Sequence, residues 1–207
     1  DNFAWTSRGY NDLAAFTQEY NLITDLSSNI DDGHNWIVGG SSDDTIVIDA
    51  VAGLTTSNLT PDFEYLVSAN EGNDSITVSS ALRGWIAGGS DDVITANAGT
   101  QAYFAGDGGN DTLTGAELDD RMYAGAGDDT LIGGAGNDTL DGGLGNDTYI
   151  FDHQSGFETI LDTSGNDTIT FNLYNNYFNG TYLREGDDFV FRTNDDTAGF
   201  RVTYHFA

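Results

Sequence analysis

The chain has 207 residues, of which 34 are acidic and only six are basic, so its formal net charge is -28. Charge of this sign and size argues against binding to nucleic acid or to anionic membrane surfaces, and it opposes compaction unless cations screen it. There is no cysteine to form disulfide bonds, and no apolar run reaches the length of a membrane span. The length suits one domain or one long repeat array.

The first 29 residues contain no repeat. Asn11 is placed to cap a short helix in which Leu13, Phe16 and Tyr20 recur at helical spacing. Residues 1–29 are therefore predicted to form an N-terminal cap or linker that is irregular or partly helical.

Residues 30–68 are predicted to form degenerate first coils with an insertion. A nine-residue block at residues 39–47 has Asp44 at its sixth position and an apolar residue at its eighth. Residues 48–68, which include Pro61, then interrupt this register.

The nine-residue register returns at residue 69, and its eighth position stays apolar up to residue 150. The residues at that position are Ile76, Trp85, Ile94, Phe104, Leu113, Met122, Leu131, Leu140 and Tyr149. Ala96 exceeds the period by one residue, so the loop beside Asp92 is where a bulge or a shift is expected. Such a continuous apolar position indicates a packed coil rather than a disordered Gly/Asp-rich segment.

Residues 106–150 are five consecutive blocks, GDGGNDTLT, GAELDDRMY, AGAGDDTLI, GGAGNDTLD and GGLGNDTYI, each with aspartate at position six. Gly-rich hexapeptides turn sharply, and the three residues that follow form only a short strand with one inward side chain. Two blocks then make one coil, so loops two blocks apart stack about 4.8 Å from each other. An ion with oxygen ligands at about 2.3–2.6 Å fits between two such loops, touching an aspartate from each.

These blocks resemble the RTX (repeats-in-toxin) nonapeptide G-G-x-G-x-D-x-U-x, which winds a calcium-loaded parallel β-roll. The resemblance implies an all-β fold: a right-handed parallel β-roll, or β-solenoid, over residues 69–170 with a small antiparallel C-terminal cap over residues 171–207. It also implies that several Ca²⁺ ions are held by aspartates and by carbonyls of the glycine loops. The implied ligands are Asp44, Asp74, Asp92, Asp111, Asp120, Asp129, Asp138, Asp147, Asp167, Gly106, Gly108, Gly125, Gly127, Gly134, Gly136, Gly143 and Gly145.

Alternate blocks lie on opposite edges of such a roll. One edge then carries aspartate in every coil from Asp74 to Asp147, whereas the other carries Arg83 and Ala102 before Asp120 and Asp138. One ion in each gap between stacked aspartates gives about five core calcium sites. Arg83 is interpreted as a degenerate turn that partly neutralises its acidic neighbours.

The C-terminal part restores one nonapeptide at residues 162–170, with Asp167 at position six. Beyond it, residues 182–204 alternate apolar and polar side chains and are predicted to form two or three antiparallel strands. Such a cap covers the last coil and hides an edge that would otherwise pair with another chain.

The leading hypothesis is a calcium-dependent folding module of a larger bacterial protein exported by type I secretion machinery. The family resemblance implies a chain that stays unfolded in low-calcium cytosol and folds outside the cell. Asn-Asp-Ser/Thr sequons inside the loops favour a bacterial origin, because glycans there would obstruct the ions. No catalytic motif is found, so no enzyme activity is expected. One alternative is a surface or glycan-binding module of an adhesin or S-layer-like protein, and another is an accessory module of a secreted lipase, protease or epimerase.

Overall fold

The computed structural model of the chain describes residues 34–38, 41–48, 64–69, 71–78, 83–87, 89–97, 99–101, 103–152, 155–162, 164–172, 180–185, 188–193 and 199–203. The predicted N-terminal cap, residues 1–29, lies outside these residues. Within them, no helix is long and apolar enough to cross a membrane.

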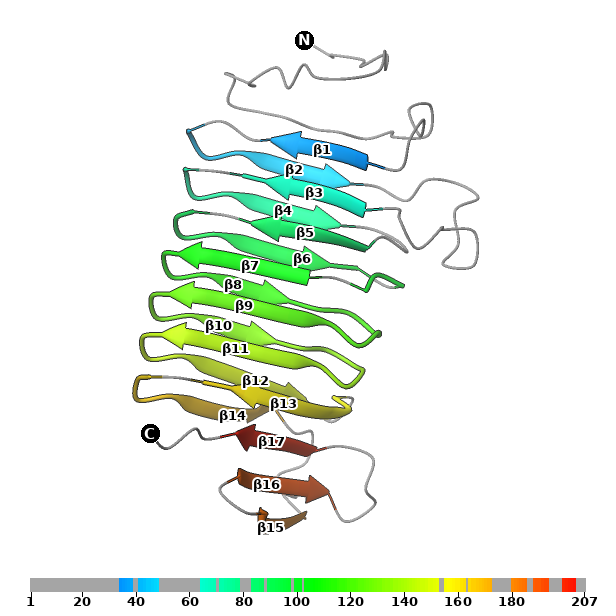
Figure 1. Cartoon of the computed structure of the whole chain (residues 1–207), viewed down its shortest axis with the longest axis vertical. Coiled ribbons are helices and arrows are strands. Elements are labelled where there is room, and N and C mark those ends of the chain that lie inside the picture. Colours follow the sequence, from blue (N-terminus) through cyan, green and yellow to red (C-terminus); the bar gives the residue numbers. More distant parts are fainter. Residues whose placement is uncertain are drawn as a thin grey trace.

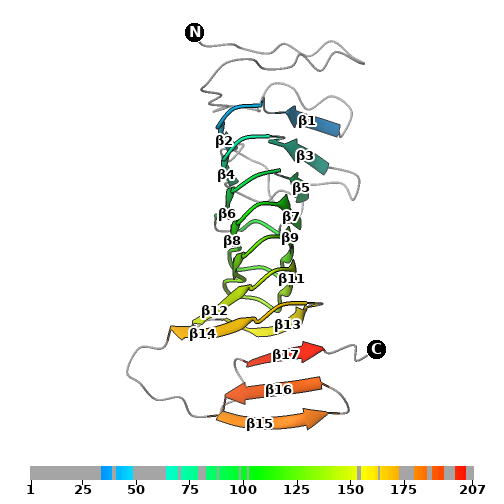
Figure 2. The same cartoon turned by 90° about the vertical axis from the view of Figure 1, so that its left-hand side faces the viewer.

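Two parallel sheets face each other, and successive strands from β1 to β14 alternate between them (Figures 1 and 2). The first sheet holds β1 (His34–Val38), β3 (Glu64–Ser68), β5 (Arg83–Ala87), β7 (Tyr103–Gly108), β9 (Arg121–Ala126), β11 (Thr139–Leu144) and β13 (Phe157–Leu161). The 7-stranded second sheet holds β2 (Thr45–Ile48), β4 (Ser75–Val78), β6 (Val93–Ala96), β8 (Thr112–Thr114), β10 (Thr130–Ile132), β12 (Thr148–Asp152) and β14 (Thr168–Asn172). The predicted parallel β-roll is confirmed.

The core is a column of inward side chains contributed by the strands of both sheets. In the second sheet, paired strands align Ile46, Ile76, Ile94, Leu113, Leu131 and Tyr149, and each is at most 1% exposed. In the first sheet, Phe104, Met122, Leu140 and Ile160 align in the same way and are equally hidden from solvent. Because side chains alternate along a strand, the neighbours on each side face the solvent or the loops.

The sequence interpretation of β5 is wrong by one residue. Ile86, not Trp85, takes the register position of Phe104, so the sixth-position equivalent is Gly84 rather than Arg83. The connection before β5 is one residue longer than the period and the connection after it is one residue shorter. The offset therefore cancels within one coil and leaves the aspartate edge in register.

The extra residue near Ala96 does not bulge there. Ala96 of β6 pairs with Val78 of β4 and is only 4% exposed. The additional residue therefore lies in the connection from β6 to β7. The loop beside Asp92 is not shifted either, since the Asp92 N–H donates to Asp111 Oδ1 at 2.8 Å.

The C-terminal cap comprises three strands, β15 (Gly180–Glu185), β16 (Asp188–Thr193) and β17 (Gly199–Thr203), which pair antiparallel in the order β17-β16-β15. In addition, β17 pairs parallel with β13, so the cap extends the first sheet to 10 strands. Beneath the last coil, Phe151, Phe171, Phe191 and Phe200 form a cluster with ring centroids 5.1–5.9 Å apart. The predicted antiparallel cap is thus confirmed, and its aromatic rings fill the end of the core column.

Candidate metal centre

Carboxylates of the sixth repeat position form a hydrogen-bonded ladder along one edge of the roll. The backbone N–H of each donates at 2.7–3.1 Å to Oδ1 of its counterpart in the next coil, in the order Asp44, Asp74, Asp92, Asp111, Asp129, Asp147 and Asp167. These residues precede the even-numbered strands, so the ladder follows the loops on the left of Figure 1. We refer to this row as the long ladder.

The opposite edge carries a shorter row of the same design, here termed the short ladder. The Asp120 N–H donates to Asp138 Oδ1 at 2.8 Å, and the Asp138 N–H donates to Glu158 Oε2 at 2.9 Å. Glu158 was missed from the sequence because two extra residues precede it and because the repeat motif specifies aspartate. The sequence does contain a signal for Glu158. Ile160 follows it at the same spacing that separates the aspartate from the inward residue in the regular blocks.

One carboxylate oxygen of most ladder residues is left without a hydrogen-bond donor. These buried oxygens are Oδ2 of Asp74, Asp111, Asp129, Asp138 and Asp147 and Oε1 of Glu158, and their residues are at most 2% exposed. A buried anionic oxygen without a partner is costly, whereas a cation between two coils would satisfy it. Anionic oxygens in a loop of backbone carbonyls are the hard donor set that suits Ca²⁺, so the residues present fit this ion.

The pKa values of the long-ladder carboxylates favour the binding of a cation. Burial, reinforced by the carboxylates of adjacent coils, raises the pKa of Asp111 to about 7 and the pKa values of Asp74 and Asp147 to about 6, although backbone N–H donors oppose the shift. Burial also raises the pKa values of Asp92 and Asp129. Each group is therefore disfavoured as an anion in the metal-free fold.

At the short ladder, burial and then the Asp138 carboxylate raise the pKa of Glu158. Burial likewise raises the pKa of Asp138. The two side chains can share a proton when Glu158 is neutral, but when both are ionised their free oxygens have no donor. A divalent ion would replace that proton and remove the repulsion.

The glycine loops explain why the carboxylates stay in place. A side chain at Gly106 would meet Oδ2 of Asp111, and one at Gly142 would meet Oδ2 of Asp147, so the first position of the block confines its own aspartate. At Gly145, with φ of 137°, a side chain would meet the carbonyl oxygen of Gly127 in the previous coil. Successive loops thus stack backbone on backbone, with the ladder between them.

The predicted glycine ligands occupy four different positions of the block. Gly125, Gly134 and Gly143 hold the second position and Gly127, Gly136 and Gly145 the fourth, all with positive φ and all against backbone atoms of the preceding coil. Gly106 lies against Asp111, whereas Gly108 ends β7 and pairs with Ala126 as an ordinary strand residue. Coordination by their carbonyl groups remains a prediction.

A further row of hydrogen bonds, here termed the outer ladder, involves residues at the fifth repeat position on both edges. It was not predicted. Its N–H groups donate to the side chain of the previous coil, at 2.7–3.1 Å, opposite in direction to the carboxylate ladders. The pairs are Asn73 to Asp43, Asn110 to Asp91, Asp128 to Asn110, Asn146 to Asp128, Asn166 to Asn146, Asn137 to Asp119 and Phe157 to Asn137. The frequent Asn-Asp pairs of the sequence therefore have two separate roles, because the exposed residue links coils and the buried one faces the candidate ions.

A parallel roll whose turns hold rows of buried carboxylates, most with one oxygen that lacks a donor, has the features of a cation-binding repeat module. Comparison with family models identifies the repeat: the RTX calcium-binding nonapeptide repeat matches in four copies, at residues 30–47, 103–117, 114–149 and 154–170. The chain therefore carries RTX calcium-binding repeats, as its sequence predicted, and calcium is the ion they bind.

Among solved structures, the chain is similar to the extracellular lipase LipA from Serratia marcescens, with 15% identity and a TM-score of 0.26. The alignment covers 87% of this chain and 40% of the lipase, so the chain spans well under half of that protein. A TM-score this low does not establish a common fold, and the β-roll assignment rests on the strand pairing described above. A search of curated proteins finds no match.

Proposed function

We propose that this chain is a calcium-dependent folding module of a larger secreted bacterial protein, without catalytic function of its own. The observation that carries the proposal is the row of buried carboxylate oxygens that lack any hydrogen-bond donor. Their regular spacing supports a structural ion array rather than a reaction centre, because each gap offers the same pair of groups.

The residues that would hold calcium are the consecutive members of the two ladders. On the long ladder these are the pairs between Asp74 and Asp147, with Asp44 and Asp167 at the ends; on the short ladder, Asp120, Asp138 and Glu158. Bound calcium supplies positive charge that offsets the desolvation and mutual repulsion of these groups. Because the unfolded chain does not preform the gaps, the binding free energy becomes folding free energy.

This linkage supports a role in export. A net charge of -28 and the absence of cysteine leave the metal-free chain with strong self-repulsion and no covalent staple. In low-calcium cytosol such a chain would stay unfolded and compatible with a type I secretion channel. In calcium-rich medium outside the cell it would fold and stabilise the parent protein.

A second candidate function, surface or glycan binding, is favoured by the outer face of β7 and β9. Tyr123 is 61% exposed there, and the exposed Arg121 lies 5.6 Å from the Tyr103 ring centroid. Flat aromatic rings beside a cation can stack on the apolar faces of sugars. This function would be supported if the chain binds to a glycan array in calcium and the Tyr123→Ala variant loses this binding while its melting temperature is unchanged.

The folding proposal is tested by circular dichroism and thermal melting in metal-stripped buffer, in millimolar calcium and in millimolar magnesium. We expect strand-type dichroism and a cooperative melt only in calcium, since magnesium prefers rigid, partly hydrated octahedral sites. Equal melting midpoints in chelator and in calcium would contradict the proposal.

The export role needs its own measurement. Here the full chain is fused to a type I secretion signal and its export is followed with cytosolic calcium raised or kept low. Export that continues at high cytosolic calcium, with the chain folded there, would contradict it.

A further inference from the structure

The last coil departs from the repeat at two positions that touch each other. Position one of the regular blocks is Gly or Ala, but position one of the block at residues 162–170 is Asp162. Position eight of the blocks at residues 106–141 is Leu or Met, but in the next block it is Tyr149. The Tyr149 hydroxyl accepts the Gly142 N–H at 2.8 Å and donates to Asp162 Oδ2 at 2.7 Å. The departures therefore form one structural unit.

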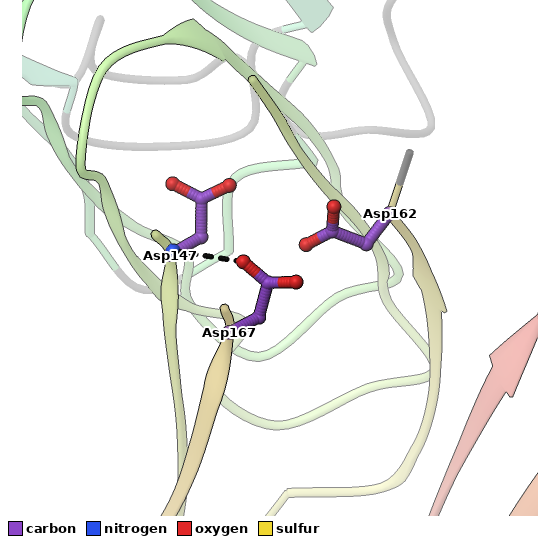
Figure 3. A group of neighbouring side chains, drawn as sticks. All are labelled: Asp147, Asp162 and Asp167. Carbon is purple, nitrogen blue, oxygen red and sulfur yellow. Dashed lines mark hydrogen bonds between the residues drawn. The ribbon is translucent and has the colours of Figure 1, made fainter. Parts of the chain in front are cut away.

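Asp162 brings a third carboxylate to the end of the long ladder. Oxygens of Asp147, Asp162 and Asp167 all lie within 4.8 Å of one another, and Figure 3 shows the three side chains converging from separate segments of the last coils. In the part of the chain that the structure describes, this is the one place where three such groups meet in this way. The gaps of the inner coils are each bounded by two ladder carboxylates.

Independent evidence for a ligand comes from the Asp147 side chain. It is 0% exposed, its Oδ1 accepts the Asp129 N–H at 2.9 Å, and its Oδ2 has no hydrogen-bond partner. The Asp147 N–H in turn donates to Asp167 Oδ1 at 3.1 Å. The fully buried Asp147 carboxylate thus has one oxygen without a donor, and an oxygen of this carboxylate lies within 4.8 Å of oxygens of Asp162 and Asp167.

Tyr149 fixes the third carboxylate from the core side. One oxygen of Asp162 accepts the tyrosine hydroxyl and the other accepts the Ser164 N–H at 3.1 Å. The hydroxyl is itself held by the backbone of Gly142, the same glycine that confines Asp147. Outer-shell hydrogen bonds of this kind orient ligating carboxylates and tune metal affinity.

We propose that Asp147, Asp162 and Asp167 form a three-carboxylate cation site that binds calcium more tightly than the two-carboxylate gaps of the roll, with Tyr149 as its positioning residue. The inference rests on the proposed calcium-dependent folding and deepens it, because it singles out one site with more negative charge. A higher ligand charge also favours a trivalent lanthanide over a divalent ion of similar size.

The test uses the full chain and calcium alone as the first probe, in isothermal titration from metal-stripped buffer. We expect one tight class of ion in the wild type, weakened more than tenfold in Asp162→Asn and about tenfold in Tyr149→Phe, with the remaining ions unchanged. Asp162→Gly restores the residue type of the other blocks, and it should lose the same class while keeping the cooperative calcium melt. Asp107→Asn, which removes an exposed aspartate outside the cluster, is the matched control.

A second readout is terbium luminescence excited through tyrosine. The first equivalent of Tb³⁺ should give the strongest signal in the wild type and a much weaker one in Tyr149→Phe and Asp162→Gly.

Two outcomes overturn the inference. One is a tight class that persists in both Asp162 variants; the other is a loss of folding in those variants at every calcium concentration, because the group would then be structural. If the wild type itself binds no calcium, it is the folding proposal that fails.

Discussion

The substitution Asp111→Asn separates ion binding from ordinary packing. Asparagine keeps the Oδ1 acceptor for the Asp92 N–H, which lies at 2.8 Å, and it replaces the unpartnered Oδ2 with an amide nitrogen. The shape and the ladder hydrogen bond are preserved, while the anionic ligand shared by two gaps is removed.

The expected magnitudes have opposite signs with and without calcium. Burial raises the pKa of Asp111 from 3.8 to about 7, so ionising it at pH 8 costs the metal-free fold about 4 kcal/mol at 1.36 kcal/mol per pKa unit. The variant removes this cost and adds about 1–3 kcal/mol for a buried, unpaired amide. In calcium at one hundred times the dissociation constant, losing two ions costs about 5 kcal/mol. The variant should therefore be no less stable than the wild type in chelator, yet much less stable in calcium.

The assay is a calcium titration followed by circular dichroism at pH 8, with thermal melts at each concentration. Asp107→Asn, an exposed change in the same block, controls for net charge, and Leu113→Ala, at a fully buried core position, controls for packing. Leu113→Ala should lower stability by about 2–5 kcal/mol at every calcium concentration, whereas the stability deficit of Asp111→Asn should be absent in chelator and should grow as calcium is added. If Asp111→Asn and Asp107→Asn raise the calcium midpoint equally, net charge rather than ligation governs folding and this reasoning is refuted.

Three further outcomes follow from the same geometry. In metal-stripped buffer, lowering the pH from about 7 to about 4 should increase strand dichroism, because the folded state keeps protons that the unfolded carboxylates have lost. In saturating calcium, lowering the pH should instead reduce strand dichroism. Dichroism that changes with pH in the same way under both conditions would contradict the assignment of these carboxylates as calcium ligands. Glu158→Gln should bind one calcium fewer by native mass spectrometry, while an unchanged count would mean that Glu158 is not a calcium ligand. Phe200→Ala should cost about 3–5 kcal/mol in urea unfolding at saturating calcium without changing the ion count, since its buried ring packs in the aromatic cluster under the last coil and not on a ladder.

The period of the sequence predicted the fold because one physical rule repeats in every block. An inward residue such as Leu131 and a buried aspartate such as Asp129 recur at fixed spacing, and that spacing alone places successive loops on alternate edges. The rule failed where connection lengths vary. At β5 a long and a short connection exchange the register positions of Trp85 and Ile86, and no local property of two apolar residues reveals which one pairs with Phe104.

The outer ladder was not predictable for a different reason. Asn110 and Asp128 read as loop residues with high turn propensity, and turn propensity accounts for them without any contact between coils. Only the stacking of loops shows that Asn110 Oδ1 accepts the Asp128 N–H at 2.8 Å. The hydrogen bond depends on a neighbour 18 residues away, which is information about register and not about local composition.

Three departures from the repeat, Tyr149, Glu158 and Asp162, lie in the coils that meet the cap, and the physics of a stacked array accounts for them. Each coil contacts only its two neighbours, so a terminal coil lacks the loop that would supply the next carboxylate. At this end Glu158 provides a longer side chain where the short ladder ends after a lengthened loop, and Asp162 adds an acid at the end of the long ladder. Tyr149 connects that acid to the core, and the aromatic cluster beside it covers the column that further repeats would otherwise bury. Glu158 and Asp162, which depart from the motif, thus supply carboxylates at the end of the array, where no further repeat follows to supply them.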